Sequence, residues 1–535
     1  MSVVILAMTN QPAVGYRGRW IYCGQNYLDL LRWEQRLGAA DRLSFLSLIP
    51  VVFLKLRSQF VDWTSKLGET YGNSLDWWIT PLAARNTMQT PIFLHLCYLH
   101  ILLESLREEL QKGCLIVCED WFLLKTLEFN LEAEGFRVKR MPLWWLALGR
   151  DFAVRSLKIG ARWLRALALQ TRSLIAARLT ARSSRPPSGD IGDRQVLIHT
   201  CVDEDCLGSD GKFRDRYFSS LSNWLVRRGY RVTTIPWLYN INRPVSSAYR
   251  WFRENQEGFL IIDDYVRFRD FPGCILCILR SGLISHNNAY FGKYRVAPLL
   301  THERMHNISS ADLIKFLLYE QALTRWFREG NRCDIFIDMF ENMASERAQL
   351  KTVRQRQPAA LSVGYQHAPV PNELIGYSVT SREWATGIFP SRIVSHGRSS
   401  AEFLAREGFP AASVVEGPAL RYTYLVDEEM QVGQASTAAV TDNRILVLLP
   451  AELMSAMELL ARILGARDTL ASESVDVVLK VHPMMPMSQL VGRMRIARLP
   501  DGWRWGGLQL TDWMSITSVD IALPSIGFCV PMSSQ

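Results

Sequence analysis

Long apolar runs are missing from this sequence of 535 residues. The two longest candidates, residues 43–56 and 91–103, are interrupted by serine, proline, lysine or histidine. Both are shorter than the ~18–20 apolar residues that a membrane-spanning helix needs. Glycine and proline, at 33 and 23 residues, are far below the proportions found in low-complexity chains. These absences exclude an integral membrane protein built from helices, a collagen-like chain and a disordered chain.

Cysteine clusters and targeting signals are also missing. The 10 cysteines are scattered singly or in loose pairs, as is usual in a reducing compartment. Cys274 and Cys277 have CxxC spacing but lie in an apolar run without a second pair, which favours core packing over zinc or redox chemistry. The first eight residues have no basic stretch before their apolar run, so they indicate a buried strand rather than a signal peptide. We therefore expect a cytoplasmic protein.

The positive charge is concentrated in one segment. The chain has a net charge of +9, and residues 148–185 contain nine basic residues and one acidic residue, a net charge of +8. The near-neutral remainder argues against a nucleic-acid partner. Trp163 falls among the apolar residues of this segment, and five basic residues recur at helical spacing: Arg155, Lys158, Arg162, Arg165 and Arg172. Residues 146–192 are thus predicted to form a basic amphipathic helix and a linker. The helix suits peripheral contact with the anionic lipid of an inner membrane, or is a solvated helix packed on a domain.

Strands and helices are predicted to alternate on both sides of the basic segment. In the N-terminal region, residues 1–145, a strand at 114–118, a helix at 121–134 and a strand at 136–139 form a βαβ unit. Further strands are predicted at 195–200, 230–235, 259–262 and 334–337, in a second α/β region that covers residues 193–430. A last α/β segment covers residues 431–535. The alternation predicts an α/β fold with parallel sheets.

Two short motifs raise the question of a metal. His302-Glu303-Arg304-Met305-His306 matches HExxH, the zinc-binding helix of metalloproteases. Because Pro298 precedes it and Ser310 follows as a cap for the next helix, we expect a surface turn here and keep a zinc metalloprotease as a remote alternative. Asp203-Glu204-Asp205 has a DxD form but lies in the 193–430 region. We therefore expect no metal site.

Four motifs follow one another in the second half of the chain. Phe340-Glu341-Asn342 and Glu346 are followed by Gly364-Tyr365-Gln366-His367, then by residues 416–422 (EGPALRY), and finally by Lys480-Val481-His482-Pro483. In this order they resemble the two-lobed, GT-B-type glycosyltransferases of bacterial surface polysaccharide biosynthesis, such as O-antigen or capsule synthesis. The resemblance covers residues 195–525 and implies two Rossmann-like lobes.

The resemblance also implies roles for individual residues. The lobe at 431–535 would bind a nucleotide-sugar donor through His482, Pro483 and Ser525. The lobe at 193–430 would bind a lipid-linked glycan acceptor, with His367 as the base because imidazole has an ordinary pKa near ~6.5. Glu341 is the competing base, or orients the acceptor. No cofactor is implied besides the activated sugar.

The C-terminal end departs from the family pattern. The family has a second Ser, a helix with an acidic residue and a Gly-x-Pro-Val strand where this chain has only ten residues after Ser525. The segment from Arg444 onward is short for a full nucleotide-binding lobe. The rival hypothesis is therefore a non-catalytic scaffold or binding protein of the same pathway.

Overall fold

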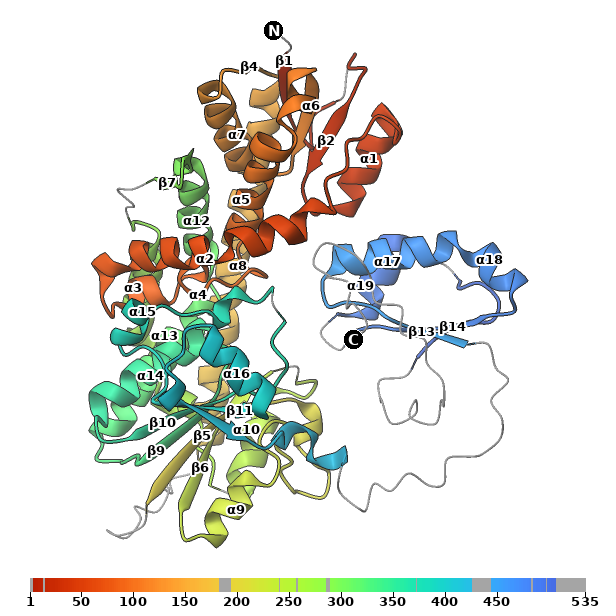
Figure 1. The fold of residues 1–535 in the computed structure, drawn as a ribbon. Coiled ribbons are helices and arrows are strands. Elements are labelled where there is room, and N and C mark those ends of the chain that lie inside the picture. Colours follow the sequence, from red (N-terminus) through yellow and green to blue (C-terminus); the bar gives the residue numbers. More distant parts are fainter. Residues whose placement is uncertain are drawn as a thin grey trace. The chain divides into compact units, whose positions relative to one another are not determined.

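A computed structural model gives the structure of the chain. It describes residues 3–12, 15–181, 194–239, 241–255, 258–284, 289–371, 373–425, 444–482, 485–496 and 498–506 (Figure 1). Two compact units are present, each assembled from separate stretches of the sequence. Unit 1 comprises Met1–Lys55, Cys97–Leu148 and Gln431–Gln535, and unit 2 comprises Leu56–Leu96 and Gly149–Met430. The first three boundaries fall inside helices α2 (Leu48–Gly68), α5 (Ile92–His100) and α8 (Trp144–Thr180).

The N-terminal part of unit 1 is a parallel sheet with strand order β2-β3-β1-β4. Its central strand β3 (Cys114–Cys118) is buried at every residue. Helix α7 (Trp121–Ala133) follows, and the Asp120 side chain caps it by accepting from the backbone amides of Phe122 and Leu123. The predicted βαβ unit is therefore present. The other elements are β1 (Val3–Met8), β2 (Trp20–Cys23), β4 (Arg137–Arg140), α1 (Tyr27–Leu37) and α6 (Arg107–Gln111).

The C-terminal part of unit 1 is a smaller parallel sheet with order β13-β14-β15. Val447, Leu460 and Leu479 are among the residues of its core, and all three are buried. The elements are β13 (Arg444–Leu448), α17 (Leu453–Gly465), α18 (Arg467–Ser472), β14 (Asp476–Lys480), α19 (Met487–Met494) and β15 (Trp503–Trp505). Strands β13 and β14 are adjacent and parallel, and Val447 pairs with Leu479.

Unit 2 is built on a six-stranded sheet with order β12-β11-β10-β9-β5-β6, parallel throughout. Leu197 faces one core cluster, while its neighbours Val196 and Ile198 face another, so the sheet is buried on both faces. Together with the sheets of unit 1, this confirms the predicted α/β fold class. The strands are β5 (Gln195–Val202), β6 (Arg231–Leu238), β9 (Ile335–Met339), β10 (Leu361–Tyr365), β11 (Arg392–His396) and β12 (Val414–Gly417).

Helices cover the sheet of unit 2 and connect its strands (Figure 1). One predicted element differs: residues 259–262 do not form a strand of the sheet. Phe259 makes a single bridge to Thr234, and the chain then turns into a 3₁₀ helix at Ile262–Tyr265. The helices are α3 (Leu75–Trp78), α4 (Pro81–Ala84), α9 (Leu221–Arg227), α10 (Val245–Glu254), α11 (Phe271–Ser281), α12 (Ala297–Ser309), α13 (Leu313–Arg328), α14 (Ala344–Arg356), α15 (Ser381–Ala385) and α16 (Arg398–Arg406).

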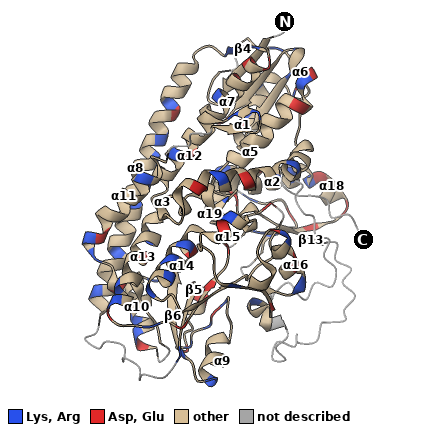
Figure 2. Cartoon of the chain, turned by 60° about the vertical axis from the view of Figure 1, so that its left-hand side comes forward, with Lys and Arg blue, Asp and Glu red and all other residues tan. Residues whose placement is uncertain are grey.

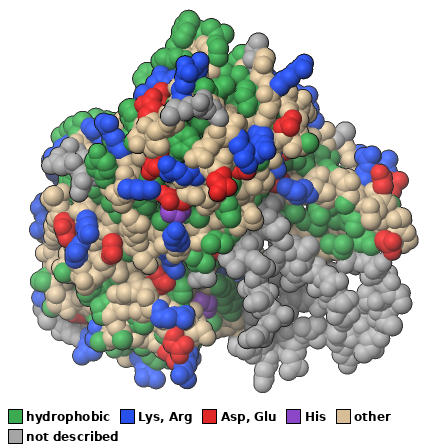
Figure 3. Space-filling model, turned by 45° about the horizontal axis from the view of Figure 1, so that its top comes forward, with side chains coloured by type: hydrophobic (Ala, Val, Ile, Leu, Met, Phe, Trp, Pro, Cys, Tyr) green, Lys and Arg blue, Asp and Glu red, His purple; other side chains and the backbone are tan. Residues whose placement is uncertain are grey.

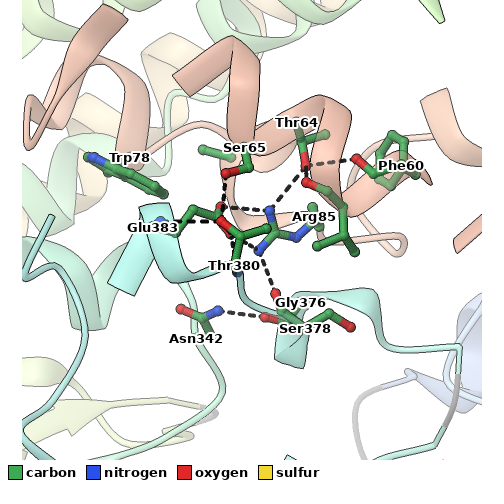
Figure 4. A network of polar contacts seen from close by, with 12 residues as sticks. Phe60, Thr64, Ser65, Trp78, Arg85, Asn342, Gly376, Ser378, Thr380 and Glu383 are labelled. Carbon is green, nitrogen blue, oxygen red and sulfur yellow. Dashed lines mark hydrogen bonds and ion pairs between the residues drawn. The ribbon is translucent and has the colours of Figure 1, made fainter. Parts of the chain in front are cut away.

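A buried ion pair ties the stretch 56–96 to the rest of unit 2 (Figure 4). The Nη1 atom of Arg85 lies 2.7 Å from Oε1 of Glu383, and the two side chains are 0% and 3% exposed. The same guanidinium donates to the Ser378 carbonyl at 2.5 Å and to Thr64 Oγ1 at 3.1 Å. Because these partners use most of the donors of Arg85, the charge is compensated in a site that water does not reach.

Removing Arg85 should therefore be costly. We expect Arg85→Ala to lower the free energy of unfolding by about 3–5 kcal/mol, because Glu383 would be left buried without its counter-charge. Urea unfolding followed by tryptophan fluorescence measures this loss. The control is Arg398→Ala, which breaks an exposed pair with Glu402 and should cost less than ~1 kcal/mol. Equal losses in the two variants would contradict the assignment.

Candidate functional site

The motifs of unit 2 meet at one edge of its sheet. Strands β9, β10, β11 and β12 are adjacent and parallel, so the residues that follow them gather at their carboxyl ends. Tyr365 pairs with Met339 on one side and with Val394 on the other. The turn at Glu341, the turn at His367 and the segment after Gly417 are brought together in this way.

The turn after β9 is held by the carboxylate of Glu346. It accepts hydrogen bonds from the backbone amides of Glu341, Asn342 and Met343 at 2.8, 2.9 and 3.2 Å. Asn342 has the left-handed backbone angle φ of 58°, a conformation that asparagine tolerates better than most residues. Its side chain donates to the Gly376 carbonyl at 2.5 Å (Figure 4). It also accepts from Arg347 at 3.0 Å. Asn342, Glu346 and Arg347 are thus supports that fix the position of Glu341.

Glu341 and His367 form a pair. Oε1 of Glu341 lies 3.2 Å from Nε2 of His367, and the glutamate side chain is 43% exposed whereas that of the histidine is only 5% exposed. The ring of Tyr217 packs edge-on against the imidazole, with centroids 4.8 Å apart. Among the described residues, Nδ1 of His367 is shielded from solvent and has no hydrogen-bond partner. If Nε2 carries the proton and donates to Glu341, Nδ1 keeps a lone pair that can accept a proton.

The segment after β12 contacts the same turn. The hydroxyl of Tyr365 donates to the Pro418 carbonyl at 3.0 Å and accepts from the Leu420 amide at 2.7 Å. The guanidinium of Arg421 lies over the ring of Tyr217, 5.2 Å from its centroid. Two of the sequence motifs are therefore linked directly through Tyr365.

The sequence analysis did not identify Tyr217 as a site residue, because no motif marks it and it is 150 positions away from His367.

Another histidine, His396, and the thiol of Cys201 lie near this edge. Burial and the neighbouring His367 lower the pKa of His396. Burial raises the pKa of Cys201 to about 12, an effect to which the charges of Glu341 and Asp338 add and which Lys315 opposes. Cys201 is thus a protonated thiol at neutral pH, within electrostatic range of both Glu341 and Lys315.

The acidic residues after β5 already form ion pairs and hydrogen bonds within the chain. Arg216 forms ion pairs with both Asp203 and Asp205, the latter at 3.2 Å. Oδ1 of Asp215 accepts from the amides of Tyr217 and Phe218 at 2.8 and 2.9 Å, while its Oδ2 is shielded without a partner among the described residues. Burial raises the pKa of Asp215 to about 6. These contacts fix the backbone of Tyr217 beside His367.

The predicted donor-binding residues lie in the other unit. His482 lies two residues beyond the end of β14, and burial lowers its pKa. Pro483 and Ser525 lie outside the described residues. Of the predicted site residues, Glu341 and His367 are in contact, while His482 belongs to unit 1.

The HExxH segment is a helix and not the expected surface turn. Pro298 stands in the first turn of α12, where its missing amide does no harm, and Ser310 ends this helix instead of capping the next. Glu303 is buried and accepts from the Thr90 hydroxyl at 2.5 Å. Arg155 contacts His302 at 3.2 Å, and the charge of Arg162 acts on His306. The positive charges of Arg155 and Arg162 near these imidazoles would repel a zinc ion. This geometry therefore favours a structural helix over a metalloprotease site.

Helix α8 presents a mixed basic and apolar face to solvent. Leu157, Leu164 and Leu179 are 75%, 73% and 79% exposed, and Figure 2 shows Lys and Arg recurring along the helix. Trp163, expected on the apolar side, turns inward: its Nε1 donates to the Ile308 carbonyl at 2.9 Å and its ring packs on the core. On the face shown in Figure 3, in contrast, basic side chains lie among acidic and apolar ones. Within the described residues, no helix has both the length and the apolar character needed to cross a bilayer.

Comparisons with known proteins give only remote similarities. No protein-family model and no curated protein matches the chain. Three of the solved structures that match are UDP-N-acetylglucosamine 2-epimerases from Rickettsia bellii and Methanocaldococcus jannaschii and the α,α-trehalose 6-phosphate synthase from Burkholderia multivorans. Their TM-scores are 0.33, 0.31 and 0.29 at 9%, 9% and 10% identity. Each match covers 60% of this chain and 71%, 75% and 74% of the other. At this distance they establish neither family nor function.

The raised pKa of Asp215 predicts a pH-dependent stability. Because the folded chain holds this proton up to about pH 6 and the unfolded chain loses it near pH ~3.9, its stabilising contribution is complete below pH ~4 and disappears as the pH rises to 6. Asp215→Asn keeps the accepting oxygen but does not titrate. Its stability relative to the native chain should therefore rise by about 2 kcal/mol between pH 4 and 6.

Urea unfolding at a series of pH values measures this difference. The control is Asp210→Asn, because Arg214 lowers the pKa of that exposed carboxylate and no such rise should occur. A flat difference for Asp215→Asn would show that the carboxyl titrates normally.

Proposed function

We propose that this chain is a glycosyltransferase that moves a sugar from a nucleotide-activated donor to a lipid-linked surface polysaccharide. The observation that carries the proposal is the Glu341–His367 pair at the carboxyl edge of a parallel sheet, with a buried imidazole nitrogen that has no partner among the described residues. Leaving such an acceptor unpaired costs about 1–3 kcal/mol. A hydroxyl group of the acceptor, donating to Nδ1, would recover this energy.

The proposed chemistry is an inverting displacement. Glu341 accepts from Nε2–H and so fixes the tautomer of His367. Nδ1 takes the proton of the acceptor hydroxyl while the hydroxyl oxygen forms a bond to the anomeric carbon of the donor. The bond from that carbon to the phosphate of the donor breaks, and the nucleotide leaves with the electron pair. The carboxylate of Glu341 then stabilises the imidazolium, as an anion does for a nearby cation.

Tyr217 lies next to the proposed base, and Arg421 lies over the ring of Tyr217. Tyr217 covers the imidazole and would move when the acceptor enters, while Arg421 adds a positive charge beside the same ring. On the donor side, His482, Pro483 and Ser525 are proposed to contact the phosphates, with no metal and no cofactor besides the activated sugar. These donor contacts rest on the family resemblance alone.

Membrane attachment through α8 is the second part of the proposal. The lipid-linked acceptor requires the protein to reach a membrane surface. Exposed leucines beside Lys158, Arg162 and Arg165 combine an apolar contact with charge complementarity to anionic lipid, where each basic residue adds about 1 kcal/mol. Leu157 and Leu164 replace Trp163 as the proposed apolar anchors.

The catalytic assignment predicts a split between turnover and donor binding. His367→Ala should lower the rate of transfer by about 10²–10⁴-fold, the usual contribution of a general base. It should leave the dissociation constant of the sugar nucleotide unchanged, because the proposed donor contacts lie in unit 1. Glu341→Gln should cause a smaller loss, since the amide oxygen still accepts from Nε2–H.

A panel of CMP-, UDP- and GDP-activated sugars, tested by calorimetry and by nucleotide release with membrane extracts, identifies the donor. Tyr290→Phe, an exposed aromatic residue outside the site, is the control variant. A larger loss for Glu341→Gln than for His367→Ala would transfer the role of base to Glu341. Failure of every sugar nucleotide to bind would support the scaffold hypothesis instead.

The membrane assignment predicts binding that depends on charge. The chain should co-sediment with vesicles that contain anionic lipid and be released as salt rises from 0.1 M to 1 M, because the Debye length falls from ~10 Å to ~3 Å. Reversal of Lys158, Arg162 and Arg165 to Glu should abolish sedimentation, and Leu157→Ser with Leu164→Ser should weaken it. The control reverses Arg227, Arg398 and Arg498, three exposed residues elsewhere. Equal sedimentation of both triple variants would refute a role for α8.

A further inference from the structure

Unit 2 contains a concave site that the Glu341–His367 pair does not line. A cavity of about 310 Å³ lies where β6 ends, bordered by α8 on one side and α13 on the other. This volume is at the lower end of the range for small-molecule sites. Its aromatic lining includes Trp237, Tyr249, Phe316 and Tyr319, and its polar lining includes Gln170, Ser173, Tyr239, Asp312 and Lys315.

The ammonium group of Lys315 is the only basic side chain among the lining residues. Its Nζ lies 3.5 Å from the ring centroid of Trp237, and it makes one long hydrogen bond of 3.5 Å to the Leu238 carbonyl. Among the described residues, no carboxylate lies within ion-pair distance of it. Burial lowers the pKa of Lys315 to about 8. An ammonium has three N–H donors, and the contacts with the Leu238 carbonyl and the Trp237 ring leave at least one of them for a ligand.

Asp263, the acidic residue whose charge acts on Lys315, is hydrogen-bonded to other groups. The pKa of Lys315 is affected by Asp263, but the carboxylate of Asp263 accepts from the hydroxyls of Tyr249 and Tyr319 at 2.7 and 3.0 Å. Burial raises the pKa of Asp263, so its negative charge is disfavoured where it lies. Lys315 is a half-buried cation without an ion-pair partner among the described residues, so an anion that entered the cavity would gain a charge-assisted hydrogen bond from it.

We propose that this cavity binds an acidic sugar unit, with its carboxylate or phosphate group on Lys315. The hydroxyl, amide and carboxylate groups of Ser173, Gln170 and Asp312 match the hydroxyls of a sugar ring, and the aromatic walls match its C–H faces. This inference rests on the proposed function, in which unit 2 holds the acceptor. Cys201 pairs in the sheet with Trp237 of the cavity wall, and the charge of Glu341 acts on its thiol. The acidic unit would therefore anchor the acceptor in the same unit as the catalytic pair.

Binding of free sugars to the full chain tests the inference without any donor. Glucuronate, glucose 6-phosphate, glucose and inorganic phosphate are titrated by calorimetry. The native chain should bind one of the two acidic sugars at least tenfold more tightly than glucose or inorganic phosphate. Lys315→Met should lose this preference, while Lys212→Met, which removes an exposed lysine, and His367→Ala should keep it.

The relative affinities for glucuronate and glucose 6-phosphate show whether the cavity binds a carboxylate or a phosphate. A preference for glucuronate assigns a carboxylate, and a preference for glucose 6-phosphate assigns a phosphate. Inorganic phosphate that binds as tightly as both sugars, or unchanged binding by Lys315→Met, would overturn the inference. If Lys315→Met does not fold, Gln170→Trp fills the cavity from α8 and should block the acidic sugar. Loss of transfer in His367→Ala with retained sugar binding separates this site from the catalytic one.

Discussion

The buried guanidinium of Arg347 is the contact on which the arrangement of unit 2 depends. This side chain is 1% exposed, and it donates to the Asn342 side chain at 3.0 Å and to the Trp78 carbonyl at 3.2 Å. It therefore joins the stretch 56–96 to the turn that presents Glu341. Because an arginine cannot readily give up its charge when it is buried, every donor needs an acceptor. Arg85 has acceptors for both of its Nη groups, Glu383 among them, so two buried cations fix this stretch against the rest of unit 2.

The side chains proposed to react at the carboxyl edge of the sheet are positioned by neighbouring residues. Glu346 uses its carboxylate on three backbone amides, which leaves Glu341 free to face both solvent and His367. Asp215 holds the backbone of Tyr217, and Tyr217 covers the imidazole. The groups proposed to react are thus held by neighbours that are already paired. Such preorganisation lowers the cost of reaching a reactive geometry.

Helix α8 divides its residues between two environments. Leu174 and Ala177 are completely buried in the core of unit 2, whereas Leu157 and Leu164 are largely exposed beside basic residues. The same helix also contributes Gln170 and Ser173 to the cavity of Lys315. One element thus carries a proposed membrane contact and one wall of the proposed sugar site. The function proposed for a residue of α8 depends on the side of the helix on which that residue lies, and not on the composition of the helix as a whole.

The alternation of apolar runs and helical segments was sufficient to predict the α/β class and most strands, because burial on both faces produces short, continuous apolar stretches. The approach of Glu341 to His367 could also be anticipated, since residues that follow neighbouring parallel strands meet at one edge. Only the tertiary structure decided the rest. Whether residues 302–306 form a helix, which side of α8 holds Trp163, and that Tyr217 covers His367 all depend on contacts between residues far apart in the chain. Local propensity carries no information about such contacts, because the atoms that decide them become neighbours only after the chain has folded.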